Sequence, residues 1–187
     1  CAMVPLRDRD HPMRFGEEEV FERAKERAEE YDWAAERLQA IIKNADEIVA
    51  GQIDIPDQGG QWSHHYVCEK CNHRLEYNEE NDTHVCPNCG AVCDGWPYDE
   101  IVYKWRHSGN WRGIRTLGLA YQFTGDEKYA EKARKYLLGY AHKYPTFELH
   151  DVRGNKSRSA GRAFAQTLNE GVQVIAPAWG YDLIYNS

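Results

Sequence analysis

Apolar residues recur every three or four positions along most of the chain, the spacing that puts them on one face of an α-helix. The first such stretch runs from Glu17 to Ala50, with three glutamates in its first turn and Gly51 directly after its last turn. A second stretch runs from Asp99 to Phe123, and the polar residues 107–110 mark a possible break within it. The pattern predicts two long helices, the second of them in one or two pieces.

Two further helices are predicted in the C-terminal half. Asp126 follows a Thr-Gly turn and is a good N-cap for a helix that Pro145 closes. The last helix extends from about Ala160 to Tyr185, with a bend or break expected at Pro177. The apolar residues expected in the core from this helix are Phe164, Leu168, Val172 and Ile175, together with Tyr181 and Tyr185. Successive helices joined by short turns indicate a mainly α fold of stacked helix pairs, as in a solenoid, a toroid or a bundle.

The segment between these helical stretches is polar, and parts of it alternate as short strands do. The chain is therefore divided into an N-terminal segment with the first long helix (1–61), an inserted β ribbon (62–97) and further helices (98–187). Residues 1–16 look irregular, and Cys1 is interpreted as the start of a cut fragment rather than as a lipid-anchored N-terminus. The ribbon has too few apolar residues to fold without a further constraint.

Two Cys-x-x-Cys pairs supply a candidate for that constraint. Cys68 and Cys71 form the first pair, and Cys86 and Cys89 form the second after a spacer of fourteen residues. Paired cysteines at this spacing are typical of a zinc ribbon, in which four thiolates surround the ion as a tetrahedron. Gly90 suits the tight turn after the second pair, where a positive φ is often needed. Because four cysteines leave no open coordination position, the predicted cofactor is a structural Zn²⁺ ion.

Other uses of these cysteines stay open at this point. The four thiols are also compatible with two disulfides or with no common role. One histidine can replace a cysteine in a structural zinc site. The nearby candidates for such a replacement are His64, His65, His73 and His84, and Cys93 is a fifth thiol.

Charge and composition narrow the range of partners. The formal net charge is −7, and no run of lysine or arginine exceeds two residues, which argues against a nucleic-acid partner. No stretch approaches the roughly 18 apolar residues of a membrane span. Twelve tyrosines and six tryptophans suit a surface that stacks on sugars, although aromatic residues also fill cores.

Four motifs of this chain resemble motifs of the heparinase II/III and oligo-alginate lyase group of polysaccharide lyases, and they follow one another in the same order as in that group. They are HPMRFGEEEVFERAKERAEEYDWAAERL with its Trp-Ala pair, WSHHYVC with the CP-x-CG ribbon, the hairpin LGLAYQFTGDEKYAEKARKYLLGYAHKYP, and the helix GRAFAQTLNEGVQVIAPAWGYDLI after the pair His150-Asp151. The resemblance covers almost the whole chain. It implies a partial (α/α) toroid that continues into further helices beyond residue 187, with the zinc ribbon inserted in it.

The resemblance also implies a reaction and a partner. Such lyases cleave uronic-acid polysaccharides by β-elimination, so the expected partner is an acidic polysaccharide or oligosaccharide. In the group, an Asn-His pair that neutralises the substrate carboxylate and a catalytic tyrosine come from later toroid helices. No Asn-His pair here matches, so no catalytic residue is assigned and this chain alone is expected to be inactive.

Four residues are candidates for contacting substrate. Arg162, Gln166 and Glu170 fall at i, i+4 and i+8 of the predicted last helix. We expect Arg162 to pair with a substrate carboxylate, Gln166 to bind a hydroxyl or carboxylate and Glu170 to orient Arg162. An intrahelical ladder on the surface is the alternative. His65, beside His64 and Trp62, is a weaker candidate for the same cleft, its alternative being a surface position.

Two other functions stay open. A glycoside hydrolase on an (α/α) toroid would need two carboxylates about 5–10 Å apart across a cleft. A zinc-ribbon module that binds other proteins would need no catalytic residue. Lyases that degrade polymers work in the periplasm or outside the cell, so the resemblance implies one of these locations.

Overall fold

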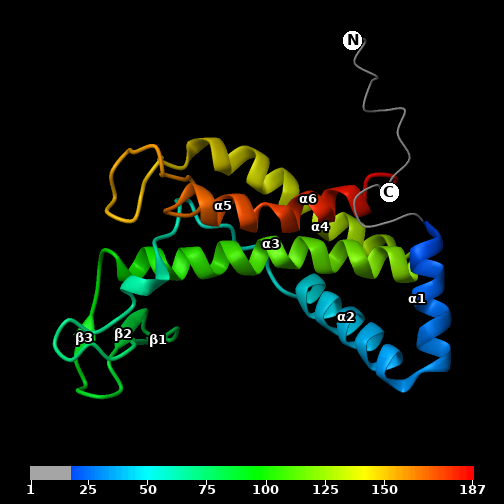
Figure 1. Cartoon of the computed structure of the whole chain (residues 1–187), viewed down its shortest axis with the longest axis horizontal. Coiled ribbons are helices and arrows are strands. Elements are labelled where there is room, and N and C mark those ends of the chain that lie inside the picture. Colours follow the sequence, from blue (N-terminus) through cyan, green and yellow to red (C-terminus); the bar gives the residue numbers. More distant parts are fainter. Residues whose placement is uncertain (1–17) are drawn as a thin grey trace, which may run out of the picture. The chain divides into compact units, whose positions relative to one another are not determined.

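The computed structural model describes residues 18–187, in which helices predominate and one small sheet is inserted (Figure 1). The irregular segment predicted for residues 1–16 and the interpretation of Cys1 lie outside the described residues. The α-helices are α1 (Glu18–Glu30), α2 (Asp32–Ala50), α3 (Tyr98–Thr124), α4 (Glu127–Lys143), α5 (Thr167–Gln173) and α6 (Ile175–Leu183). The strands are β1 (Glu76–Asn78), β2 (Thr83–Val85) and β3 (Val92–Cys93), and the short 3₁₀ turns are η2 (Ser63–His65) and η3 (Tyr144–Thr146).

The described residues form two compact units. The first contains residues 18–53, 110–140 and 174–187, and the second contains residues 54–109 and 141–173. The predicted mainly α fold with a small inserted sheet is confirmed. The predicted boundaries at 61 and 97, and the closure of the helices into a toroid, stay predictions.

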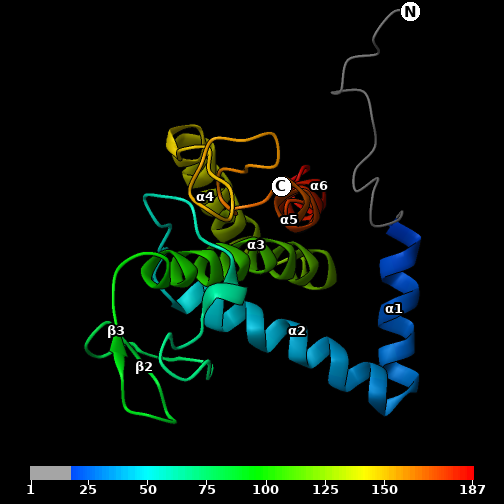
Figure 2. The same cartoon turned by 60° about the vertical axis from the view of Figure 1, so that its left-hand side comes forward.

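In the first unit, α1 and α2 replace the single long helix predicted for residues 17–50. The chain breaks at Tyr31, which is extended (φ −126°, ψ 125°). The two helices diverge from this point, as Figure 2 shows. A break of a single residue hardly disturbs the three-to-four spacing of apolar residues, so periodicity alone misses it.

Two side chains of α4 form hydrogen bonds with the C-terminal part of α2 and with Gly51, the residue after it. The Lys132 amine donates to the carbonyl oxygen of Gly51 at 2.6 Å, and the Tyr129 hydroxyl donates to Asp46 at 2.8 Å. The Lys132 contact satisfies a carbonyl group at a helix end, where such groups lack intrahelical partners, and the Tyr129 contact joins α4 to the Asp46 side chain of α2. The predicted cap at the start of α4 is confirmed, because the Asp126 carboxylate accepts the backbone N–H of Lys128 at 3.1 Å.

Small residues set the packing of α6 on α3 within the first unit. A Cβ on Gly180 would lie 2.5 Å from Ile114, and a Cβ on Gly118 would lie 2.9 Å from Leu183. The Gln122 side chain also donates to the carbonyl oxygen of Leu183 at 2.5 Å. The two backbones therefore approach closely, and the glycines make this approach possible.

The predicted helix from Ala160 to Tyr185 is wrong at its start and in most of its core. Residues 160–166 form a loop, and a break at Val174 separates α5 from α6. Pro177 explains the break, because its ring would clash with the carbonyl of Gln173, the last residue of α5. Phe164 is buried as predicted, whereas the other large apolar residues are partly or largely exposed: Leu168 (73%), Val172 (61%), Ile175 (45%) and Tyr181 (53%), with Tyr185 half-buried. The residues that α6 buries are instead Ala176, Gly180, Asp182 and Leu183, and the first two of these are small.

Helix α3 is continuous over 27 residues, so the break considered at residues 107–110 is absent. His107 and Ser108 are buried there, and the His107 ring lies 2.9 Å from the carbonyl oxygen of Gln58. The polar residues of this stretch make tertiary contacts from within an unbroken helix. Polarity alone does not distinguish a helix break from polar residues that are buried within a continuous helix.

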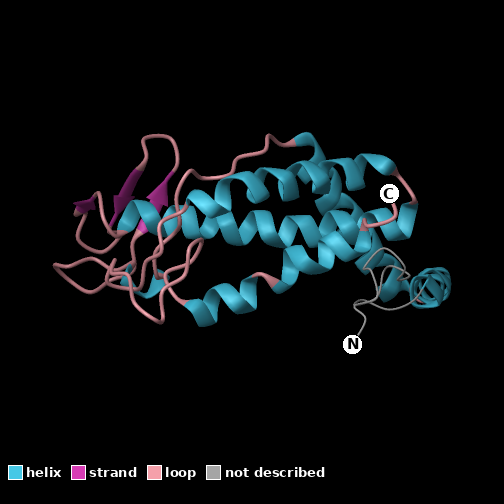
Figure 3. Ribbon diagram, turned by 90° about the horizontal axis from the view of Figure 1, so that it is seen from above, coloured by secondary structure: helices cyan, strands magenta, loops and turns pink. Residues whose placement is uncertain are grey.

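The second unit contains the inserted ribbon. Its strands pair antiparallel in the order β1-β2-β3, with Tyr77 opposite His84 and His84 opposite Cys93 (Figure 3). One buried cluster, of Tyr66, Cys68, Leu75, Cys86, Tyr98 and Ile101, joins the ribbon to the start of α3. Most of this small core is aromatic or sulfur-containing, as expected of a segment with few aliphatic residues.

Candidate functional site

The two Cys-x-x-Cys pairs form two turns with the same backbone geometry. Cys68 N–H bonds to the carbonyl of His73 and Asn72 N–H bonds to the carbonyl of Cys68. The second turn repeats both bonds: Cys86 N–H to Ala91, and Gly90 N–H to Cys86. The residue after each pair has a positive φ, 56° at Asn72 and 69° at Gly90. The predicted positive φ of Gly90 is confirmed, and Asn72 is its counterpart in the first turn.

These turns bring the four sulfur atoms together. The Sγ atoms lie 3.6 Å apart between Cys68 and Cys89, 3.5 Å between Cys71 and Cys86, and 3.6 Å between Cys71 and Cys89. All four lie within 4.8 Å of one another. A tetrahedron with metal–sulfur bonds of about 2.3 Å has edges of about 3.8 Å, whereas a disulfide would need about 2.05 Å. The four cysteines can therefore hold a metal ion, and no pair of them is bonded as a disulfide.

The electrostatics of the cluster also favour a cation. Hydrogen bonds from the Asn88 side chain and the His73 backbone lower the pKa of Cys71 to about 6. The pKa of Cys89 is raised to about 12: the Ala91 N–H lowers it, but the neighbouring Cys86 and Cys71 sulfurs raise it more. The Cys71 thiolate thus forms easily, whereas Cys89 resists ionisation beside it, because like charges so close together repel. A bound cation removes this repulsion.

His84 is excluded as a metal ligand by its other contacts. Its Nδ1 atom lies 2.6 Å from the Tyr66 hydroxyl, and its Nε2 atom lies 2.9 Å from the Asp99 carboxylate. The ring is fully buried, with Tyr77 stacked on it at 5.4 Å between centroids. Nδ1 therefore fastens β2 to Tyr66, and Nε2 fastens it to the start of α3. Cys93 and the other three histidines also lie outside the sulfur cluster, which contains four cysteines only.

Three of the four candidates for binding substrate, Arg162, Gln166 and Glu170, do not share a helical face. Arg162 and Gln166 lie in the loop before α5, and only Glu170 lies on the helix. The loop holds its conformation by two isolated bridges, His150 with Gly161 and Gly60 with Phe164. These bridges use backbone groups that a helix through residues 160–166 would need for itself. The predicted i, i+4, i+8 arrangement is therefore wrong.

Glu170 is the centre of this loop. Its Oε2 atom accepts the backbone N–H groups of Arg162 at 2.8 Å, Ala163 at 2.7 Å and Phe164 at 3.0 Å. Its Oε1 atom accepts the Tyr144 hydroxyl at 2.5 Å. Burial, and then the neighbouring carboxylate, raise the pKa of Tyr144 to about 12, so this hydroxyl stays a donor. The carboxylate contacts the backbone of Arg162 and not its guanidinium group.

The Arg162 guanidinium group has backbone partners of its own. Its Nη1 atom donates to the carbonyl oxygen of Phe147 at 2.5 Å and lies 3.4 Å from that of Pro145. Both side chains thus tie the segment 145–164 together. Gln166 is half-buried at the end of this loop, and its carbonyl oxygen accepts the N–H of Glu170 at 2.9 Å.

His65 lies half-buried in the turn η2, with its ring 5.5 Å from that of Trp62. His64, in the same turn, is exposed and lies 4.6 Å from the Trp62 ring. The indole of Trp62 and the imidazoles of His64 and His65 therefore lie close together, shortly before Cys68 in the chain.

A groove of about 390 Å³ in the second unit was not anticipated from the sequence. Gln61, Trp96, Glu100, Phe147 and His150 are among the residues that line it. Trp96 is 55% exposed, and the Oε2 atom of Glu100 is buried with no hydrogen-bond partner among the described residues. No local motif marks this set, because its members come from three separate segments spread between residues 57 and 154. A tryptophan followed at i+4 by a glutamate was the only signal in the sequence.

Two alginate lyases are related to this chain in sequence. An exo-oligoalginate lyase of Saccharophagus degradans is 32% identical over 159 residues, which cover 83% of this chain and 16% of that lyase. An alginate lyase of Stenotrophomonas maltophilia is 37% identical over 79 residues, which cover 42% of this chain and 10% of that lyase. This chain therefore spans about a sixth or less of the length of either relative. No protein-family model matches it.

The resemblance to the oligo-alginate lyase group is thereby confirmed, while the relation to the heparinase II/III lyases stays a prediction. None of the described helices combines the length and the hydropathy that a membrane crossing requires.

Proposed function

We propose that this chain is part of the helical region of a polysaccharide lyase that cleaves a uronic-acid polymer by β-elimination. The observation that carries the proposal is the 32% identity to an exo-oligoalginate lyase over 83% of the chain. The proposed substrate is an acidic polysaccharide or oligosaccharide, and the proposed place of action is the periplasm or the cell exterior. The proposed architecture is the partial (α/α) toroid expected from the sequence.

The proposed reaction needs three groups around the sugar. A base removes the C5 proton, the electron pair left behind forms the C4–C5 double bond, and the C4–O bond breaks as an acid protonates the departing oxygen. The C5 proton becomes acidic enough only if a neighbouring group stabilises the charge that develops on the carboxylate. Base and acid must also lie within hydrogen-bond reach of their atoms. We assign none of these roles to residues of this chain.

We further propose that the cysteine cluster binds Zn²⁺ through Cys68, Cys71, Cys86 and Cys89. All four donors are sulfur and their spacing suits a tetrahedron, which is the arrangement of structural zinc sites. Zinc here would stabilise the ribbon and the aromatic cluster beneath it. We propose no part for this zinc site in the cleavage of the glycosidic bond.

For Arg162 and Glu170 we propose a positioning role instead of direct contact with substrate. Their hydrogen bonds fix the loop that carries Phe147 and His150, two residues of the groove in the second unit. Gln166 and His65 keep their proposed roles as candidates for contacting the sugar. Changes at Arg162 should then alter the affinity for substrate through the loop, without abolishing turnover.

The reaction is tested by ultraviolet absorbance on the full-length protein that contains this chain, incubated with a panel of uronic-acid polymers. β-Elimination leaves a double bond conjugated to a carboxylate, which absorbs, whereas hydrolysis does not. Rising absorbance on one polymer supports the proposal and identifies the substrate class. A flat trace with new reducing ends would instead indicate a glycoside hydrolase. No reaction from folded, metal-loaded protein would indicate a zinc-ribbon binding module.

The metal is tested separately, by elemental analysis of the purified protein. One equivalent of zinc is expected, and replacement of Cys86 by serine should abolish it. Cys93→Ser is the matched control, because that thiol lies outside the cluster and should leave the zinc content unchanged.

A further inference from the structure

An open groove of about 370 Å³ lies in the first unit, along α1 and α2. Its floor is apolar and includes Leu38, Ile41 and Phe123. Its polar lining consists of three arginines, Arg23, Arg27 and Arg37, with no acidic residue among the lining residues. The groove thus combines an apolar surface with positive charge, in a chain whose formal net charge is −7.

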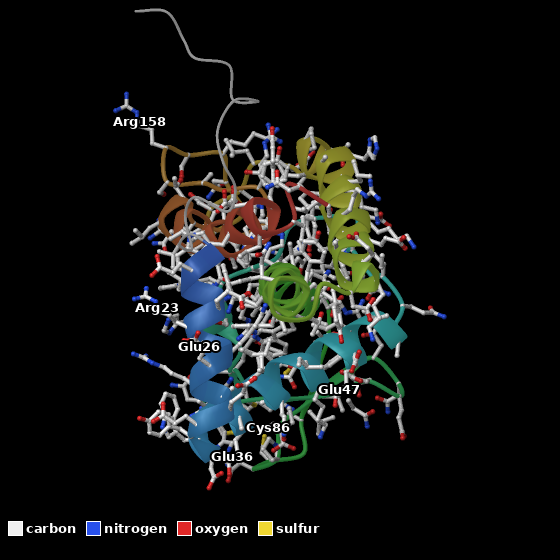
Figure 4. The ribbon with its side chains drawn as sticks, turned by 90° about the vertical axis from the view of Figure 1, so that its right-hand side faces the viewer. Arg23, Glu26, Glu36, Glu47, Cys86 and Arg158 are labelled. Atoms are coloured by element: carbon white, nitrogen blue, oxygen red, sulfur yellow. The ribbon has the colours of Figure 1, made fainter. Side chains whose placement is uncertain are left out.

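The three arginines are available for an external partner. All three are exposed, and no ion pair within residues 18–187 engages any of them. Arg23 and Arg27 stand one helical turn apart, about 6 Å along the axis of α1. Figure 4 shows Arg23 projecting outward from α1. By contrast, the charged side chains of Lys128, Lys143 and Arg106 are each paired with a carboxylate.

An aromatic surface lies at the same place. Trp33 lines the groove with 61% of its surface exposed, and Tyr31, 45% exposed, lies beside it with 6.3 Å between ring centroids. The two rings are inclined by 34°, with Tyr31 at the break and Trp33 in the first turn of α2. Aromatic faces of this kind pack against the C–H faces of sugar rings, while arginines bind carboxylates through paired N–H groups.

We propose that this groove binds the chain of an acidic polysaccharide, with Trp33 under a sugar ring and Arg23, Arg27 and Arg37 pairing with successive uronate carboxylates. The inference rests on the proposed function for the identity of the polymer. It adds a binding site made only of residues from the first unit. The groove of the second unit differs in charge, because its lining includes Asp57, Glu100 and Glu148 and no lysine or arginine.

The test uses the full-length protein that contains this chain and compares it with variants, by calorimetric titration with a uronate hexasaccharide at low salt. Arg27→Ala should weaken binding about threefold, as expected for an exposed charge pair. Trp33→Ala should weaken binding about fivefold through the loss of stacking. Arg23→Ala combined with Arg27→Ala should also lower the sensitivity of binding to salt, because fewer charges are screened.

Lys43→Ala is the matched control, since Lys43 is an exposed cation of α2 outside the groove. It removes the same charge and should change the affinity by less than Arg27→Ala does. A neutral β-glucan hexasaccharide serves as the second probe and should bind no more weakly to the arginine variants than to the unchanged protein. Thermal melting of each variant checks that the fold is retained.

Two results would overturn the inference. One is equal uronate binding by the unchanged protein and by both Arg27→Ala and Trp33→Ala. The other is equal loss of affinity with Lys43→Ala, which would indicate a general effect of net charge. Either can occur while the protein still forms unsaturated products, so failure of this inference is distinguishable from failure of the proposed reaction.

Discussion

The ribbon and the loop before α5 are two irregular segments of the second unit, and each is organised around one charged centre. In the ribbon the centre is the four-cysteine cluster, which two similar turns create. In the loop it is the Glu170 carboxylate, which accepts three backbone N–H groups and one hydroxyl. The first centre is visible in the sequence as a spacing of cysteines. The second is one glutamate among many. A sequence pattern therefore reveals a site made of regularly spaced residues, but not a site made by one common residue and the distant groups it contacts.

The largest expected effect comes from removing the ribbon's centre. Cys86→Ala, or chelation of the metal, should unfold residues 66–96, because metal binding in so small a segment is worth about 10 kcal/mol of folding free energy. Hydrogen exchange should show loss of amide protection in β1–β3 while α2 and α4 stay protected. Unchanged protection in metal-free protein would mean that the aromatic cluster alone holds the ribbon.

The second effect comes from removing the loop's centre. Glu170→Ala leaves several backbone N–H groups without their acceptor and should lower the free energy of unfolding by about 2–4 kcal/mol. Urea denaturation measures this loss. Glu170→Gln keeps one acceptor oxygen and should cost less, and Tyr144→Phe, which removes one donor only, about 1 kcal/mol. A Glu170→Ala protein as stable as Tyr144→Phe would show that the backbone contacts contribute little.

A pH effect should follow from His107, which packs against Phe147 and against Phe164 of the loop before α5. Burial lowers the pKa of His107 below its usual value of 6.5. Above about pH 6.5 the imidazole is neutral in both the folded and the unfolded chain and adds no pH dependence. Below that value the unfolded chain binds the proton more readily, so the free energy of unfolding should fall as the pH falls. Thermal melting between pH 7.5 and pH 5 tests this, and His107→Gln should flatten the dependence.

The smallest effect concerns the equivalence of the two cysteine turns. Gly90→Ala and Asn72→Ala both place an alanine at a positive φ, at a cost of about 1 kcal/mol each. Asn72→Gly should be neutral or slightly stabilising. Melting temperatures of zinc-loaded protein measure all three. A cost of alanine relative to glycine that differs clearly between positions 72 and 90 would show that the turns are not equivalent in energy.

The sequence predicted the parts of this molecule that depend on neighbours along the chain. The start of α4 at Asp126 and the positive φ of Gly90 follow from local rules, and so does the gathering of the four cysteines. The mainly α fold with an inserted sheet follows from periodicity and polarity.

The parts that were missed depend on distant partners. Residues 160–166 have helical periodicity, but their backbone bonds to His150 and Gly60 outweigh it. The exposure of Ile175 and Tyr181 was missed because α6 buries Ala176 and Gly180 instead, and apolar patterns favour large residues over small ones. Likewise, the arginine-lined groove depends on the divergence of α1 and α2 at Tyr31, which no spacing reveals.

The spacer between the two cysteine turns has a consequence for how freely this protein can vary. Each end of the spacer is a cysteine turn closed by hydrogen bonds among its own few residues, and the link between β1 and β2 around Glu80 and Asn81 is exposed. Lengthening a closed loop costs little, about 0.6 kcal/mol for each doubling. Related proteins can therefore differ in this segment by insertions without losing the site, and the same position is a suitable place to attach a reporter or an affinity tag.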